Sequence, residues 1–207
     1  MYCVSIGIKD YKKAMEVIGE YEMAEIRLDL CDFDRRQVKE IFSSHDNLIA
    51  TYRKGEETLE YRDSIIKTAV AYGAAWLDLD MDYNDDGYIS GLKDFCSGYN
   101  TKLILSVHNY NETPPIEKIK AYIQKANNLN ADLIKLVFYS NSEADNERVL
   151  SLYKENTDII AFNMGELGMV TRVASIELGA PFTYVGLDGE TTAPGQMTIS
   201  QIKKYPH

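Results

Sequence analysis

The segment KLILSVHNYN, residues 102–111, places a histidine directly after an apolar run. His108 follows the buried-strand pattern Leu103-Ile104-Leu105, at the end where the run turns polar. An imidazole changes its charge near neutral pH, so His108 is a candidate general acid or base. A lone histidine is more often structural than catalytic, and its role therefore depends on what stands at the ends of the other runs.

A lysine inside the apolar run LIKLVFY, residues 133–139, is the candidate nucleophile. Lysine is rarely buried without a specific reason. Apolar surroundings disfavour an ammonium ion, and a neutral amine attacks carbonyl carbons to form a Schiff base. The alternative is that Lys135 reaches solvent from the end of a short strand, but its mid-run position favours the nucleophile.

Charged residues alternate in the run AEIRLDL, residues 24–30. Glu25, Arg27 and Asp29 are two residues apart, which predicts that all three face the same side of a strand. Burial of such a cluster is costly unless its members pair or bind a ligand. An internal salt bridge and a binding site explain the pattern equally well.

Two further runs end in charged residues. Arg53 ends LIATYR and precedes Glu56 and Glu57, either of which alone is typical of a solvated loop. Asp78 and Asp80 lie within AWLDLDM and are candidates to line the interior of a sheet.

The segment DYNDDG, residues 82–87, matches the start of a calcium-binding EF-hand loop. The twelfth position, which should supply a bidentate glutamate, is Lys93, and a strand pattern precedes the segment instead of a helix. We interpret it as an acidic loop that starts a helix, and we expect no metal site.

The last two runs are followed by segments suited to an anion. Gly165 and Gly168 flank a predicted helix start, with Arg172 one turn inside it, and a turn-rich loop carries Thr192 and Gln196. Free N–H groups at a helix start together with an arginine can bind a carboxylate or a phosphate.

The elements that must position these residues form a regular series. Eight apolar runs are predicted strands: 2–8, 24–30, 48–53, 75–81, 102–108, 133–139, 159–165 and 182–188. Helical patterns fill the intervals: 11–21, 35–45, 59–73, 87–98, 115–129, 142–155, 165–179 and 198–205. Eight strand–helix units predict a parallel (β/α)8 TIM barrel, of the α/β class, with its site at the carboxyl ends of the strands. An open doubly wound sheet is the alternative.

Composition narrows the possible partners. The 207 residues carry a net charge of −10, which argues against nucleic acid or an anionic membrane as partner. No linker, low-complexity tract or composition shift divides the sequence, which predicts a single domain, 1–207. Three scattered cysteines, with no membrane-length apolar run and no signal-peptide pattern, favour the cytoplasm. An amine, an imidazole and several arginines suit metal-free Schiff-base chemistry on an anionic hydroxylated carbonyl compound, by an aldolase or a dehydratase.

Six motifs occur in one order along nearly the whole chain: EIRLD, ATYR with GEE, SVHNY, LIKLV, MGELGMVTR and TAPGQ. In these the chain resembles the type I 3-dehydroquinate dehydratases, Schiff-base enzymes of the shikimate pathway that use no cofactor and are usually homodimers. The resemblance implies that Lys135 forms an iminium with the substrate ketone, that His108 transfers protons, and that Glu57 orients His108. It also implies that Arg172, Thr192 and Gln196 bind the substrate carboxylate and that Glu25, Arg27 and Arg53 bind the ring hydroxyls. Ser5 would be a further pocket residue, and Met164 and Tyr184 would form apolar walls.

Three departures from the family pattern accompany the match. Thr192 and Thr171 stand where serine is usual, and both keep the hydroxyl. We also expect the chain to lack the N-terminal hairpin that closes the barrel floor in longer members. Two other functions stay open, an aldolase that binds phosphorylated substrates and a non-catalytic barrel that binds a pathway intermediate.

Overall fold

The computed structural model describes residues 1–53, 57–193 and 195–205. Glu56, in the motif GEE, and Pro194, in TAPGQ, lie outside the described residues. The chain divides into two compact units, Val4–Ile104 and Met1–Cys3 with Leu105–His207.

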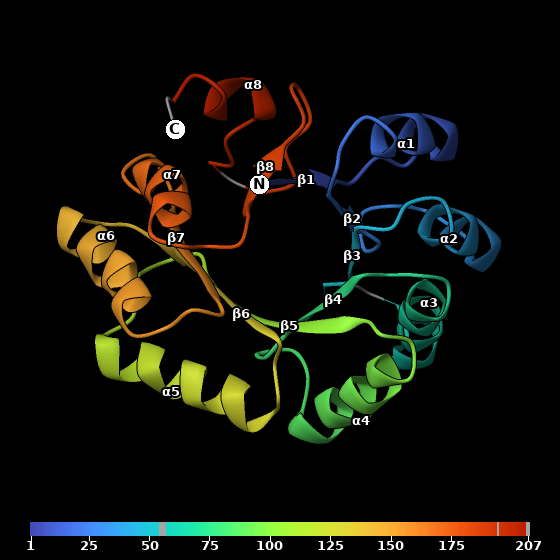
Figure 1. Cartoon of the computed structure of the whole chain (residues 1–207), viewed down its shortest axis with the longest axis horizontal. Helices are drawn as coiled ribbons and strands as arrows, with labels where there is room; N and C mark the ends of the chain where they lie inside the picture. Colours follow the sequence, from blue (N-terminus) through green and yellow to red (C-terminus); the bar gives the residue numbers. More distant parts are fainter. Residues whose placement is uncertain (54–56, 194, 206–207) are drawn as a thin grey trace. The chain divides into compact units, whose positions relative to one another are not determined.

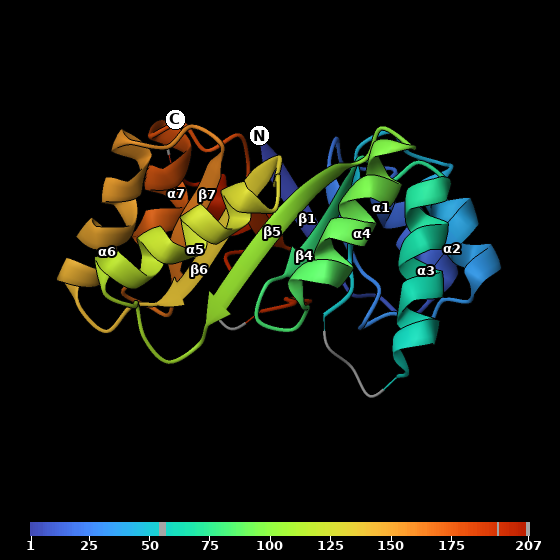
Figure 2. The same ribbon diagram turned by 90° about the horizontal axis from the view of Figure 1, so that it is seen from below.

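In the unit Val4–Ile104 the strands are parallel and lie in the order of the sequence. They are β1 (Tyr2–Ile6), β2 (Ala24–Arg27), β3 (Leu48–Thr51) and β4 (Trp76–Asp80). The helices between and after them are α1 (Tyr11–Ile18), α2 (Arg35–Phe42), α3 (Leu59–Ala71) and α4 (Asp86–Ser97), and α2 packs beside α3 (Figure 2). The register aligns Ser5 with Glu25 and Thr51 with Asp78, so polar residues of neighbouring strands lie at the same level.

The second unit repeats the alternation. Its strands are β5 (Lys102–Asn109), β6 (Leu133–Tyr139), β7 (Ile159–Met164) and β8 (Thr183–Gly186). Its helices are α5 (Ile116–Asn128), α6 (Glu143–Leu150) with a 3-10 turn η1 (Ser151–Lys154), α7 (Met169–Glu177) and α8 (Ile199–Ile202). Strands β5, β6 and β7 are neighbours, and α6 and α7 both pack on β7 (Figure 1).

Local sequence signals explain where several helices begin. Asp10, Asp34, Thr58, Asp85 and Thr198 each accept a hydrogen bond from the backbone N–H three residues ahead, as N-cap residues do. Asp85 therefore starts α4, which confirms that the calcium-like segment is a helix-starting loop. Strands β3 and β7 are buried along their whole length, as expected of parallel strands covered on both faces.

All eight predicted strands and their intervening helices are present in the described residues, but most of their boundaries differ by one or more residues, and three of these differences concern predicted site segments or helix type. Strand β2 stops at Arg27, so the prediction that Asp29 continues the strand is wrong; the chain turns at 28–30, where the Leu30 N–H donates to the Arg27 carbonyl. Helix α7 begins at Met169 and not at Gly165, whose φ of +82° interrupts the helix. The predicted helix 142–155 tightens into η1 for its last turn.

Side chains satisfy backbone groups along β7. The Tyr153 hydroxyl accepts from the Ala161 N–H at 2.7 Å and donates to the Ala161 carbonyl at 3.0 Å. Two residues further along β7, the N–H of Asn163 donates to the Thr171 hydroxyl at 2.8 Å. These hydroxyls replace strand-to-strand bonds at those positions.

We predict that Tyr153→Phe lowers the free energy of unfolding by about 1–3 kcal/mol, because both Ala161 groups lose their partner while buried. Urea denaturation would measure the change. Tyr99→Phe is the control, since Tyr99 is exposed. Equal stability of the two variants would contradict this role of Tyr153.

Candidate active site

A buried carboxylate joins β1, β2 and β3. Glu25 accepts hydrogen bonds from the Ser5 hydroxyl at 2.5 Å and the Thr51 hydroxyl at 2.9 Å. The strand register brings Ser5 and Glu25 side by side, so the predicted site residues of β1 and β2 are in direct contact. Thr51 was not predicted, although it alternates with Arg53 in the run LIATYR.

The two predicted site arginines of this unit, Arg27 and Arg53, are paired with aspartates. Arg27 contacts Asp29 through Nε at 2.9 Å and Nη2 at 2.6 Å, which is the internal salt bridge that the sequence left open. Arg53 contacts both oxygens of Asp78, at 2.8 and 3.0 Å, with Asp80 4.0 Å away. Burial by itself would lower the pKa of each guanidinium, but the facing carboxylates raise both values above the ordinary one.

Glu57 lies at the start of α3 and is exposed. It lines a cavity of about 240 Å³ together with Tyr52 and Cys31. Burial is the main cause that raises the pKa of the Tyr52 hydroxyl, and the nearby Glu57 carboxylate is the second. Burial also raises the pKa of the Cys31 thiol to about 12. Tyr52 is therefore a partner of Glu57 that the sequence gave no signal for.

In the second unit, Lys135 lies inside β6 with a side chain that is buried. Only 4% of the residue is exposed, and its Nζ lies 3.6 Å from the centre of the Tyr184 ring. The alternative that Lys135 reaches solvent is thereby contradicted. The amine instead faces an aromatic wall.

Arg172 is also buried, with 2% of the residue exposed. Its guanidinium lies 4.1 Å from the Phe162 ring centre, and Nη1 donates to the Tyr184 carbonyl at 3.3 Å. Its Nε has no hydrogen-bond partner among the described residues. Burial lowers the pKa of Arg172 to about 10. The site thus holds a desolvated cation with an open donor, which an anion would complete.

The loops after β7 and β8 touch each other. A Cβ on Gly195 would lie 3.2 Å from the Gly165 nitrogen, so the two glycines allow a close approach. Thr192 donates to Gln196 Oε1 through its N–H at 2.9 Å and its hydroxyl at 3.1 Å. Met164, at the end of β7, is buried.

His108 stands near the carboxyl end of β5, as predicted, and is half-buried. Its ring stacks on that of Tyr110, with centroids 6.3 Å apart and planes 17° apart. Within the second unit, the carboxyl end of β5 therefore contributes an imidazole, the interior of β6 an amine, and the end of β7 the loop that leads to Arg172.

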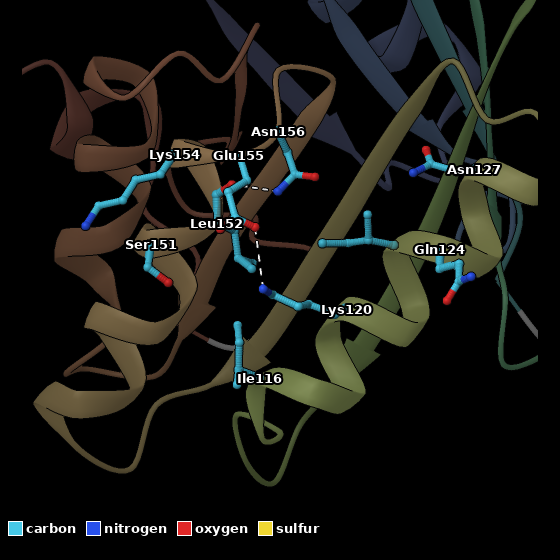
Figure 3. A pocket seen from close by; sticks show the side chains of 10 residues that line it. Ile116, Lys120, Gln124, Asn127, Ser151, Leu152, Lys154, Glu155 and Asn156 are labelled. Carbon is cyan, nitrogen blue, oxygen red and sulfur yellow. Dashed lines mark hydrogen bonds and ion pairs between the residues drawn. The ribbon is translucent and has the colours of Figure 1, made fainter.

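A surface groove elsewhere in this unit contains none of these residues. It has a volume of about 390 Å³ and lies between α5 and η1, where Lys120 pairs with Glu155 at 3.5 Å (Figure 3). Among the described residues no group of three or more His, Cys, Asp or Glu side chains is placed to hold a metal ion. No helix in the described part of the chain is long and apolar enough to cross a membrane.

A model of the type I 3-dehydroquinase family matches residues 2–206. The chain belongs to the type I 3-dehydroquinase family. A 3-dehydroquinate dehydratase of Desulfotalea psychrophila is 34% identical over 99% of this chain and 97% of its own, and one of Thermococcus onnurineus is 34% identical over 95% and 92%.

Solved structures of type I 3-dehydroquinases show the fold. The Clostridium difficile enzyme aligns with a TM-score of 0.84 at 23% identity, over 98% of this chain and 89% of that one. The Aquifex aeolicus enzyme aligns with a TM-score of 0.83 at 22% identity, over 99% and 96%. The prediction of a (β/α)8 TIM barrel is confirmed.

We predict that Arg172→Met makes the ligand-free protein more stable at pH 7, by about 1 kcal/mol, because a buried cation without a carboxylate is replaced by an apolar side chain. Burial depresses the pKa of Arg172 in the folded state to about 10, so its desolvation cost is fully present below that pH. The cost fades as the pH rises from about 10 towards the ordinary arginine value, and the gain should shrink with it.

Urea denaturation at pH 7 and at pH 10.5 would measure both effects. Arg36→Met is the matched control, because the Arg36 side chain is 74% exposed and should give no gain. If Arg172→Met is less stable than the native chain at pH 7, the guanidinium stabilises the fold and the prediction is wrong.

Proposed function

We propose that the chain is a 3-dehydroquinate dehydratase that acts through a Schiff base on Lys135. The observation that carries the proposal is the double contact of Tyr184, whose ring faces the Lys135 amine and whose carbonyl accepts from Arg172. A ketone that reaches Lys135 and a carboxylate that reaches Arg172 could then belong to one small molecule. Membership of the family, and relatives named 3-dehydroquinate dehydratase, support this substrate.

The reaction starts when the neutral Lys135 amine adds to the substrate ketone and the adduct loses water to form an iminium. The iminium withdraws electrons from the adjacent carbon, so His108 can remove a proton there. The resulting enamine expels the neighbouring hydroxyl, which takes that proton from His108 and leaves as water. Hydrolysis of the conjugated iminium then releases 3-dehydroshikimate and the free amine.

The remaining side chains bind and orient the substrate. Arg172 pairs with the carboxylate, with Thr192 and Gln196 beside it, and Met164 and Tyr184 form apolar walls. The ring hydroxyls bind to Glu25, Arg27 and Arg53, with Ser5 holding Glu25. In this proposal Glu57 orients His108.

The setting of the enzyme is also a proposal. We infer that residues 1–207 form one catalytic domain that works in the cytoplasm as a homodimer, without cofactor or metal. Neither nucleic acid nor a membrane takes part, in keeping with the net charge of −10.

We predict that borohydride added with 3-dehydroquinate traps one covalent adduct on the native chain, and that Lys135→Ala forms none. The reason is that reduction fixes the bond between the amine and the ketone carbon. Intact mass measurement gives the result directly. An adduct that persists in Lys135→Ala would place the nucleophile elsewhere, and a native chain without adduct would favour the binding-protein alternative. Repeating the trap with phosphorylated aldoses tests the aldolase.

We predict that His108→Ala still forms the trapped adduct but turns over roughly 100- to 10,000-fold more slowly, the usual contribution of a general acid or base. Steady-state kinetics together with intact mass would separate adduct formation from proton transfer. His45→Ala is the matched control, because His45 bonds to the Tyr21 carbonyl and lies outside the proposed site. Turnover near the native rate in His108→Ala would remove the imidazole from the mechanism.

A further inference from the structure

The first turn of α7 lies directly against the backbone of β7. A Cβ on Gly168 would lie 2.4 Å from the Met164 carbonyl oxygen and 2.7 Å from the Asn163 carbonyl carbon. The φ of Gly168 is −79°, an ordinary helical value, so space and not backbone conformation requires glycine here. The start of α7 is therefore closer to its strand than a side chain would allow.

A single hydroxyl fastens this turn to the strand. Thr171 is fully buried, donates to the Gly168 carbonyl at 2.6 Å and accepts from the Asn163 N–H at 2.8 Å. One group must donate and accept at once, which a hydroxyl does and an aliphatic side chain of the same shape does not. We call the contact of Gly168 and Thr171 with Asn163 the α7 clamp.

The strand side of the α7 clamp is itself held in place. The Asn163 side chain is fully buried, accepts from the Thr113 hydroxyl at 3.1 Å and donates to Asn146 Oδ1 at 3.0 Å. Thr113 also donates to the Tyr139 carbonyl at the end of β6. The clamp is thus tied to the segments that follow β5 and β6, and α7 cannot rotate on β7 without breaking several buried hydrogen bonds.

Arg172 follows Thr171 immediately, so the rotation of α7 fixed by the clamp also fixes the direction of the guanidinium. Its Nη1 reaches the Tyr184 carbonyl at 3.3 Å, a long bond that a small rotation would break. We propose that Thr171 is a positioning residue that aims Arg172 at the substrate carboxylate. This inference rests on the proposed function only in the role that it gives to Arg172.

The test compares Thr171→Val, which keeps the shape and loses the hydroxyl, with Thr171→Ser, which keeps the hydroxyl. The ligands are shikimate, a hydroxylated ring carboxylate without a ketone, and its neutral carboxamide. Calorimetry should show shikimate binding about tenfold weaker to Thr171→Val, the loss of one well-aimed charged hydrogen bond. The carboxamide should bind equally well to the native chain and to Thr171→Val. Thr171→Ser should bind shikimate as tightly as the native chain does.

A purely structural role would change other quantities. Thr101→Val is the matched control, because Thr101 also buries a hydroxyl that donates to a backbone carbonyl, that of Ala74, at 2.7 Å, before the amino end of β5. It should lose stability without changing the preference for the carboxylate. Equal weakening of shikimate and carboxamide in Thr171→Val, or no weakening of either, would overturn the inference.

Turnover separates this inference from the proposed function. In Thr171→Val the KM for 3-dehydroquinate should rise about tenfold, while the borohydride adduct at saturating substrate stays complete. A native chain that binds shikimate no better than its carboxamide would refute both the carboxylate role of Arg172 and the inference. If Thr171→Val does not fold, Thr171→Ala takes its place, because it removes the same hydroxyl, and the same outcomes apply.

Discussion

The buried guanidinium of Arg172 is the constraint on which this half of the site depends. Taking a cation out of water is costly, and proteins usually offset that cost with a carboxylate. Arg27 and Arg53 follow this rule through Asp29 and Asp78. Arg172 has instead an aromatic ring, a single carbonyl and, among the described residues, no carboxylate. The difference separates two arginines that face a carboxylate from one to which the proposed function assigns the carboxylate of the substrate.

Holding an unmatched cation requires a rigid surrounding, because a mobile side chain would move its charge out to solvent. The contacts that hold the surroundings of Arg172 in place are made to the backbone of β7 and not to the arginine itself. Gly168 lets α7 lie against the strand, and Thr171 and Tyr153 occupy backbone groups of Asn163 and Ala161. The hydrogen bond from the Asn163 N–H to Thr171 thus serves β7 and α7 together, so the proposed aim of Arg172 and the stability of the strand would depend on the same contact.

The arrangement of strands and the identity of the charged residues could be predicted from the sequence, because both depend on local patterns. Apolar runs of six or seven residues mark β1 to β8, and Lys135 is conspicuous inside one of them. The partners of these residues could not be predicted, since Ser5 and Glu25 are 20 positions apart and meet only through strand register. The misplaced Asp29 has a similar cause: alternation indicates a common face, but it does not show where the backbone stops pairing.

Tyr184 contacts both the Lys135 amine and the Arg172 guanidinium, to which the proposed function assigns different tasks. Its ring faces the amine of Lys135, whereas its backbone carbonyl, on the strand itself, accepts from Arg172. The face of an aromatic ring attracts an ammonium group and also packs against an uncharged amine, whereas the proposed Schiff base forms only from the uncharged amine. A backbone carbonyl engages one nitrogen of a guanidinium and leaves the others for a carboxylate. One residue of β8 therefore contacts both the amine on β6 and the guanidinium on α7, which is why the proposed function assigns the ketone and the carboxylate of a single small substrate to these two groups.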